Sequence, residues 1–471
     1  MKRPLTVLAA AMVALTAGAG AMFAGSVPDR AEAADRGNPH GVTGDLAHSS
    51  TRAISKAEAL AHPERLVTLA KSLHTRVVNA RLPLTTDQGA LWPSDSDPRW
   101  LISCNESDPD KPGLLRTELA TGRSQTILTG TDSCDPVRRT AWGTIVIGEE
   151  TGGGPEGGRL YELIDPLHTT GVTLDRSTGR FSGGTGAANL TVRPGVGRMS
   201  YEGISVLPNG LLYYADENRP DKGAPGGALF KFVPDKPRAA GAGPIHRLSD
   251  SPFASGRVYG LRLGRYEGGR DYGQGTQTGQ GAWIPVPDRT DPDLTGATAA
   301  LHLTGLYRPE DMDLDGTALA AGQVRACVNE TGNEDEAQNW GESVCLTDGT
   351  VAAATTNAAI PQVQLFVPGS PAVNMPDNMA FRPGRGSWIV HEDGDTESDL
   401  QGFHGNDLWS CLPDGSDPDL QSDGCIRVAT VNDPMGSFTG GVFDATGRHL
   451  YVIVQYNVTG YGVLLDISGW K

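Results

Sequence analysis

Six short apolar stretches of this chain each end on an acidic or amide residue, and this recurrence limits the possible folds more than any other feature. The six are SDPRWLISCNE ending at Glu106, WGTIVIGEE at Glu150, PNGLLYYADE at Glu217, DGTALAAGQVRACVNE at Glu330, GRGSWIVHED at Asp393 and ATGRHLYVIVQYN at Asn457. Each begins near a polar turn and is rich in residues that favour strands. The pattern therefore predicts an all-β chain with a repeated unit.

The repeat favours a six-bladed β-propeller over a pair of β-sandwiches. The copies are unevenly spaced, which sheets repeated radially around a central channel tolerate because loops of any length can join the blades. In a propeller, equivalent strands end on one face near the axis. We therefore expect the acids at these ends to converge, namely Glu106, Glu149, Glu150, Asp216, Glu217, Glu330, Glu392 and Asp393.

The regions before the propeller have a different character. Residues 1–33 carry Lys2 and Arg3, then an apolar and small-residue run ending in AEA, which indicates a secretory signal peptide. Residues 34–81 form an N-terminal extension in which Ser55–Ala80 shows a rough 3.6-residue apolar stripe, so we expect a helix there. The propeller is predicted over residues 82–471. We expect a secreted, extracellular protein that is a monomer.

The six cysteines fall into three sequential pairs. In an exported chain an even number of cysteines suggests disulfides, and pairing nearest neighbours gives Cys104–Cys134, Cys327–Cys345 and Cys411–Cys425. This is one of 15 possible connectivities. No CxxC pair is present, so zinc coordination by cysteine has little support.

Clustered carboxylates need a cation between them, since they cannot otherwise all remain ionised. Oxygen ligands suit calcium, magnesium, manganese or ferric iron better than zinc or copper. The net charge of −17 repels nucleic acid and anionic membranes, so we expect neither as a partner. The sequence lacks HExxH, GxSxG and GxxxxGK[ST], which argues against zinc hydrolases, esterases of the nucleophile-elbow type and phosphate-loop enzymes.

Two further loops could bind calcium separately. Asp311–Gly316 matches the first six positions of a calcium-binding hand, but the twelfth residue is Gly322 where the motif has Glu. His391–Asp399 is a second oxygen-rich loop. Either segment could equally be a solvated acidic turn.

Six blocks, in order, resemble the PhoX alkaline phosphatase family of secreted, metal-dependent β-propeller phosphomonoesterases. The blocks are AWGTIVIGEE (141–150), GRMSYEG (197–203), LYYADENR (212–219), LYRPEDMD (306–313), MPDNMAF (375–381) and PMGSFTGGVFDATGRHLYVIVQ (434–455). The resemblance implies a cluster of calcium and iron on the channel axis, a phosphate-ester substrate and in-line hydrolysis. It implies metal ligands at Glu149, Glu150, Glu202, Asp216, Glu217, Glu310 and Asp377. It also implies Arg308 and Glu310 as catalytic residues, with Arg308 binding phosphate.

Three positions depart from the family pattern. Gly148 stands where the family has Cys, Ser437 where an acid is expected, and Tyr456-Asn457 where the family tends to have His-Pro. Because a thiolate favours iron while carboxylates suit calcium, we expect calcium and little iron. Cys134 is an alternative thiolate ligand, because the family also has a Cys shortly before its WGT block. Two other functions remain open, a calcium-dependent lactonase-like hydrolase and a non-catalytic calcium-binding propeller.

Overall fold

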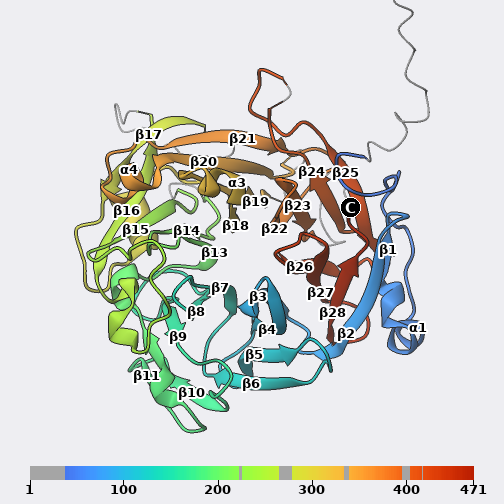
Figure 1. Ribbon diagram of the computed structural model, residues 1–471, viewed down its shortest axis with the longest axis horizontal. Coiled ribbons are helices and arrows are strands. Elements are labelled where there is room, and N and C mark those ends of the chain that lie inside the picture. The colour runs from blue at the N-terminus through green and yellow to red at the C-terminus, as the bar shows by residue number, and fades with distance from the viewer. Residues whose placement is uncertain (1–37, 222–224, 265–277, 334–338, 395–403, 416) are drawn as a thin grey trace, which may run out of the picture. The chain divides into compact units, whose positions relative to one another are not determined.

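The computed structural model describes residues 38–221, 225–264, 278–333, 339–394, 404–415 and 417–471. The predicted signal peptide lies outside these residues. The unit over residues 38–471 is built almost entirely of antiparallel strands around one axis, as Figure 1 shows. No helix among the described residues combines the length and hydropathy needed to cross a membrane.

The strands form six blades, numbered here along the chain. The first three blades have innermost strands β3, β7 and β13. Blade 1 comprises β3 (Thr86–Ser94), β4 (Asp97–Asn105), β5 (Pro112–Glu118), β6 (Ser124–Thr129), β10 (Val172–Asp175) and β11 (Arg180–Ser182). Blade 2 comprises β7 (Cys134–Arg139), β8 (Ile145–Glu149), β9 (Leu160–Leu163) and β12 (Leu190–Val192). Blade 3 comprises β13 (Tyr201–Val206), β14 (Leu212–Asp216), β15 (Leu229–Pro234) and β16 (Gly256–Leu263).

The other three blades have innermost strands β18, β22 and β26. Blade 4 comprises β18 (Pro309–Leu314), β19 (Gln323–Glu330), β20 (Glu342–Thr350) and β21 (Gln362–Pro368). Blade 5 comprises β22 (Pro376–Arg382), β23 (Ser387–Glu392), β24 (Asp407–Cys411), β25 (Cys425–Val431) and β1 (Val67–Leu69). Blade 6 comprises β26 (Ser437–Phe443), β27 (His449–Gln455), β28 (Gly462–Ser468) and β2 (His74–Leu82).

The innermost strands close a ring around the axis. Contacts run from β3 to β7, β13, β18, β22 and β26, and from β26 back to β3. By hydrogen bonding alone there are five sheets, because β17 (Gly279–Pro285) pairs with both β16 and β21 and joins blades 3 and 4 into one nine-stranded sheet. The predicted β-propeller is confirmed, and its inner ring has six members.

The predicted helix over Ser55–Ala80 is correct only at its start. Ser55 caps α1 (Lys56–Ala61), which ends at His62 because Pro63 disfavours helical backbone in the residue before it. A short 3₁₀ turn follows, and the valine- and threonine-rich remainder forms β1 and β2. The apolar stripe fails accordingly, since Leu60 is 41% exposed.

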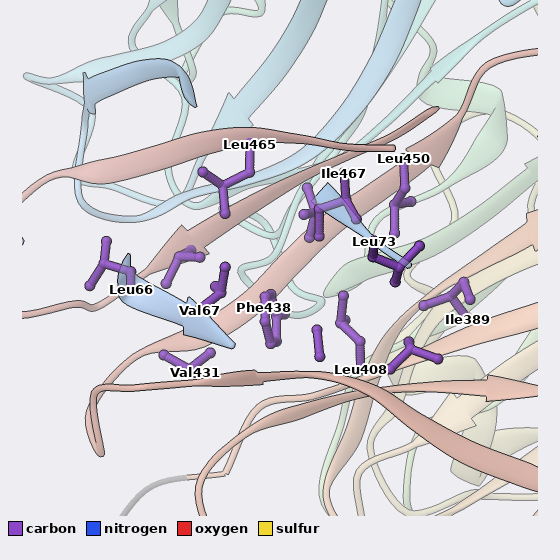
Figure 2. Close-up of a cluster of buried hydrophobic side chains, with 14 of the residues drawn as sticks. Leu66, Val67, Leu73, Ile389, Leu408, Val431, Phe438, Leu450, Leu465 and Ile467 are labelled. Carbon is purple, nitrogen blue, oxygen red and sulfur yellow. The ribbon is translucent and has the colours of Figure 1, made fainter. Parts of the chain in front are cut away.

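The N-terminal strands close the propeller against its last two blades. β1 pairs antiparallel with β25, and β2 pairs antiparallel with β28. Figure 2 shows Leu66, Val67 and Leu73 packed in a buried cluster with Leu408 of blade 5 and Leu465 of blade 6. Residues that we placed in an extension before the propeller therefore belong to its blades.

In the described part of the chain, three other short α-helices each join two consecutive strands. They are α2 (Leu294–Ala300), α3 (Gly316–Ala320) and α4 (Val351–Thr355), each capped at its N-terminus by an Asp or Thr side chain.

The three predicted disulfides are present, and among the described residues no cysteine is free. Cys327–Cys345 and Cys411–Cys425 each join neighbouring strands of one blade. Cys104–Cys134 instead joins β4 of blade 1 to β7 of blade 2. All three bridges therefore link strands. Since Cys134 is bonded to Cys104, it is not a thiolate ligand.

Candidate metal centre

Two consecutive positions recur at the end of the second strand of every blade, namely the last residue of the strand and the residue that follows it. The last residues of these strands are Asn105, Glu149, Asp216, Glu330, Glu392 and Gln455, and all are buried. The residues that follow them are Glu106, Glu150, Glu217, Thr331, Asp393 and Tyr456. Successive side chains of a strand point to opposite faces, so adjacent acids such as Glu149 and Glu150 have different surroundings.

Two carboxylates of the first set are held by hydrogen bonds from neighbouring strands and loops. Glu149 accepts hydrogen bonds from the Tyr161 hydroxyl (2.7 Å) and from Arg176 Nε (2.9 Å). Glu392 accepts them from Trp409 Nε1 (2.9 Å) and the Asn374 amide (3.0 Å). These carboxylates tie strands and loops together beside the axis.

A β-bulge near the start of the innermost strand recurs in blades 1 to 5. In blade 1, Thr86 pairs with Asn105 and Gly89 with Ser103, so Asp87 and Gln88 together face the single residue Cys104. The same extra residue follows Cys134, Tyr201, Pro309 and Pro376 in the next four blades. In each bulge the first residue is an acid. The five acids are Asp87, Asp135, Glu202, Glu310 and Asp377.

Bulges re-aim side chains, and these five gather the carboxylates at the axis. Oxygen atoms of three overlapping groups lie within 4.8 Å of one another. The groups are Asp87–Glu106–Asp135, Asp135–Glu150–Glu202 and Glu202–Glu310–Asp377. Asp135 and Glu202 are each shared by two groups. The carboxylates thus form one arc from blade 1 to blade 5, called the axial cluster below.

Blade 6 does not complete the arc. Its bulge lies further along the strand, between Thr439 and Val442, and contains Gly440 and Gly441. A side chain at Gly441 would lie 2.2 Å from the His391 ring. Blade 6 instead contributes neutral donors to Asp87, namely the Thr439 hydroxyl and Gln455 Nε2.

Burial and mutual repulsion act strongly on the cluster. Burial, followed by the charges of Glu310 and Asp377, raises the pKa of Glu202 well above its ordinary range. Burial and then the charge of Glu217 do the same to the pKa of Glu150. For Glu310 burial raises the pKa to about 8, although the charge of Arg308 opposes the shift. These acids cannot all be ionised at neutral pH unless positive charge lies among them.

Arg308 brings a guanidinium to the rim of the cluster. Its Nε donates to Glu217 Oε1 at 2.6 Å, and its Nη2 lies 3.0 Å from Glu310 Oε1. The backbone of Arg308 has a positive φ of 54°. Ser133 and Met375, which also directly precede innermost strands, have positive φ angles of 44° and 47°. This shared conformation belongs to the fold and directs the chain into the strand.

The donor set fits a hard cation. All members of the three groups are carboxylates, and the buried Asp135 Oδ1 has no hydrogen-bond partner in the protein. Each group also contains one partly exposed member, Glu106, Glu150 or Asp377, so the cluster is reached from solvent. A cysteine at Gly148 has no room, because its Cβ would lie 2.5 Å from that of Tyr201.

A hydrogen-bond network that includes Gln88 and Arg138 supports the cluster at Glu202. Gln88 Nε2 donates to Glu202 Oε1 at 3.2 Å, while Gln88 Oε1 accepts from Arg138 Nη1 at 2.7 Å. Arg138 can only donate, so the Gln88 amide is oriented with its NH₂ toward Glu202. Arg138 Nη2 also bonds Asp311 Oδ1 at 2.5 Å. This network fixes the orientation of Glu202.

The structure separates the predicted ligands into two sets. Glu150, Glu202, Glu310 and Asp377 lie in the axial cluster, and Glu217 adjoins it through Arg308. Glu149 and Asp216 lie outside the three groups, and their hydrogen bonds go to other segments of the protein. Asp216 Oδ1 accepts from the Ser200 amide at 3.0 Å. We therefore exclude both from the ligand set proposed below.

Sequence reasoning missed Asp87 and Asp135. Both lie at the start of an innermost strand, whereas the repeated sequence pattern marks the ends of the second strands. The sequence does contain a signal that could have located them. In each of blades 1 to 5 an acid lies at the start of the innermost strand, and one hairpin separates it from the last residue of the second strand.

The segment Asp311–Gly316 is not a calcium-binding hand. Asp311 bonds Arg138, Asp313 accepts the Phe381 amide at 2.8 Å, and Asp315 caps α3. These carboxylates are therefore committed to strands, a helix and an ion pair. Of the loop His391–Asp399, residues 395–399 lie outside the described residues.

A further group consists of Glu392, His404 and Asp407. His404 contacts two carbonyl oxygens, Gly405 O at 2.7 Å and Ala372 O at 2.9 Å. Asp407 pairs with Arg427. The group lies beside a cavity of about 790 Å³ bordered by residues 45–51 and Arg427. Because its atoms are already paired, it is a weaker cation site than the axial cluster.

Comparison with known proteins identifies the family. The model of the family described as alkaline phosphatase PhoX matches residues 114–457, which is most of the chain. The chain belongs to the PhoX family.

A solved structure of the PhoX family has the same fold, and a second structure aligns more weakly. The Pseudomonas fluorescens PhoX, solved in complex with vanadate as a transition state analogue, aligns with a TM-score of 0.60 and 14% identity, covering 90% of this chain and 98% of that one. The PQQ-bound aldose sugar dehydrogenase from Streptomyces coelicolor aligns with a TM-score of 0.43 and 12% identity, covering 85% and 99%. A search of curated proteins found no match.

Membership of the PhoX family explains why so many acids are buried together. The family is metal-dependent, and acidic groups that could hold a metal lie on the axis of this propeller. Arg308 and Glu310, the residues of the RPE block, lie at the axial cluster.

Glu149→Gln and Glu150→Gln should have opposite effects although the residues are adjacent. Glu149→Gln removes the charge that pairs with Arg176 and should lower the free energy of unfolding by about 3 kcal/mol, with bound metal retained. Glu150→Gln should lower bound metal while leaving the metal-free protein at least as stable, because it removes repulsion from Glu217 and Glu310. Denaturant unfolding and elemental analysis of both variants test this. Loss of metal in Glu149→Gln alone would contradict it.

Proposed function

We propose that this protein is an exported, calcium-dependent phosphatase that hydrolyses phosphomonoesters at the axial cluster. The observation that carries the proposal is the arc of bulge carboxylates on five consecutive blades, with Arg308 at its rim, in a chain of the PhoX family. The three disulfides support export, since such bonds persist in oxidising compartments.

Calcium suits this ligand set. The proposed ligands are Asp87, Glu106, Asp135, Glu150, Glu202, Glu310 and Asp377. They offer many oxygens in irregular arrangement, which calcium accepts more readily than magnesium. Iron has less support, because Cys134 is in a disulfide and Gly148 has no space for a thiol.

The protein's own residues do not attract an anion to this site unless a cation is bound. With a net charge of −17 and a concentration of acids at the axis, the cation-free site repels phosphate. Calcium, when bound, supplies the positive charge that neutralises the oxygens of a transferring phosphoryl group.

Arg308 adds directional recognition. Glu217 and Glu310 hold its guanidinium at the rim, so the side chain is ordered before substrate arrives. Guanidinium N–H groups match phosphoryl oxygens in geometry, and we assign Arg308 to binding and orienting the phosphoryl group. Glu310 holds Arg308 and accepts the Thr331 hydroxyl at 2.6 Å, which fixes its own position.

Hydrolysis assays test the proposal. Purified protein with added calcium should release phosphate from simple phosphomonoesters, should lose this activity after chelation and should regain it when calcium is restored. A lactone panel run in parallel serves as the comparison. Lactone hydrolysis without phosphate release, or no hydrolysis of any ester, would overturn the proposal.

A further inference from the structure

The rim of the axial cluster carries acidic residues from five of the six blades and none from blade 6. Blades 1 to 5 each supply a bulge acid, and blade 6 supplies none because its bulge consists of two glycines. At the position that follows the second strand, four of those five blades have an acid and blade 4 has Thr331, whereas blade 6 has Tyr456. A substrate at the axis would therefore have carboxylates around most of the rim and an uncharged sector at blade 6.

Tyr456 is distinct among its six equivalents. It has a positive φ of 48°, which none of the other five has, and a bulky residue in this conformation is held there by its surroundings. Its side chain is 40% exposed, and its hydroxyl is 3.5 Å from Glu106 Oε2. The ring thus stands at the edge of the cluster, open to solvent.

Asn457 holds this turn in place. Its Nδ2 donates to Val454 O (2.8 Å) and Tyr461 O (2.7 Å), and its Oδ1 accepts from the Thr459 amide (3.0 Å). Asn457 is only 3% exposed, so these bonds are shielded from water. The orientation of Tyr456 is therefore set before any ligand binds.

The loop before β26 is joined to the turn that carries Tyr456. Asp433 accepts a hydrogen bond from the Val458 amide, which joins the loop before β26 to the loop after β27. Met435, in the first of these loops, is 53% exposed. Aromatic and thioether side chains are suited to contact with planar apolar groups.

We propose that Tyr456 forms a subsite for the alcohol portion of the ester, and that this subsite favours an uncharged aromatic group. The inference rests on the proposed function, because a phosphoryl group at the axial cluster leaves its substituent to project across the rim. An anionic substituent would be repelled by the carboxylates on five blades. An aromatic one can contact the Tyr456 ring at blade 6.

Binding of two phosphonates tests the subsite without requiring turnover. Phenylphosphonate and methylphosphonate share the anionic group and differ in the substituent. By calorimetry on calcium-loaded protein, we expect the wild type to bind phenylphosphonate about 3- to 10-fold more tightly. Tyr456→Ala should abolish this preference and leave methylphosphonate binding within about twofold. Tyr456→Phe should keep the preference because it keeps the ring.

Tyr461→Ala is the matched control. Tyr461 is a second exposed tyrosine of the same loop, but its ring lies against Arg81, 5.1 Å from centroid to guanidinium. This variant should keep the preference. A preference that survives Tyr456→Ala, equal weakening of both phosphonates, or no binding of either would overturn the subsite. Preferential phenylphosphonate binding without hydrolysis of any ester would instead overturn the proposed function and leave the subsite standing.

Discussion

Removal of bound cations should destabilise this propeller strongly. A ligand that binds only the folded state at about 1,000 times its Kd contributes about 4 kcal/mol, which for a chain of this size corresponds to a Tm lower by about 5 °C after chelation. The physical reason is that buried acids such as Glu202 and Glu310 repel one another without a counter-charge. Calorimetry with and without chelator, followed by calcium addition, measures the effect. An unchanged Tm would contradict it.

The stability of the cation-free protein should also fall with rising pH. The Glu310 carboxyl has an ordinary pKa of 4.5, and burial raises its pKa in the folded protein to about 8. Between these values the folded state retains a proton that the unfolded state has released, so the free energy of unfolding decreases as pH rises through this window. Asp216, with a pKa raised by burial to about 7, adds to the slope.

Calcium should suppress much of this pH dependence. With cations bound, the cluster carboxylates are ionised in the folded state as well, so little proton uptake distinguishes folded from unfolded protein. Unfolding curves from pH 5 to pH 8 should therefore converge at low pH and separate at high pH, with the calcium-loaded protein more stable. Parallel curves with and without calcium would argue that the cluster does not bind it.

Glu202→Gln should cause the largest loss of function among single substitutions. Glu202 is shared by two of the three groups, so the change removes a charge from both. The neutral side chain keeps an oxygen that can accept from Gln88, so the fold should persist. We expect bound calcium to fall by about half or more and phosphate release to fall by about 10²- to 10³-fold.

The matched control is Glu64→Gln, at an exposed position near the N-terminus where the Glu side chain is 45% exposed. This variant should retain both calcium and activity. If Glu202→Gln retains full calcium content and activity, the overlapping groups are not the site of binding or catalysis.

The propeller could be predicted from the sequence because its signal is repeated. Each second strand is a short apolar run with an acid or amide near its end, and six copies in order left few alternatives. The predicted N-terminal helix was too long, because an apolar stripe through Leu66 and Leu73 is as compatible with a strand as with a helix. Both side chains are buried against blades 5 and 6, but as parts of a turn and a strand connection.

The candidate ligands were only partly predictable, since the sequence shows an acid but not the direction of its side chain. Glu149 and Glu150 are adjacent, yet Glu149 bonds Arg176, in the turn between β10 and β11 of blade 1, and Glu150 lies in the axial cluster. For Asp87 and Asp135 the decisive feature is a bulge, which depends on register between two strands. Register is a property of the paired sheet, and a single strand sequence does not display it.

Elemental analysis of the wild-type protein, dialysed extensively against metal-free buffer without chelator, tests the central claim most directly. The axial cluster predicts calcium in stoichiometric amount, at least one ion per chain, with little iron. Protein that retains no calcium under these conditions, or that holds stoichiometric iron in its place, would contradict the calcium centre proposed for this PhoX-family chain.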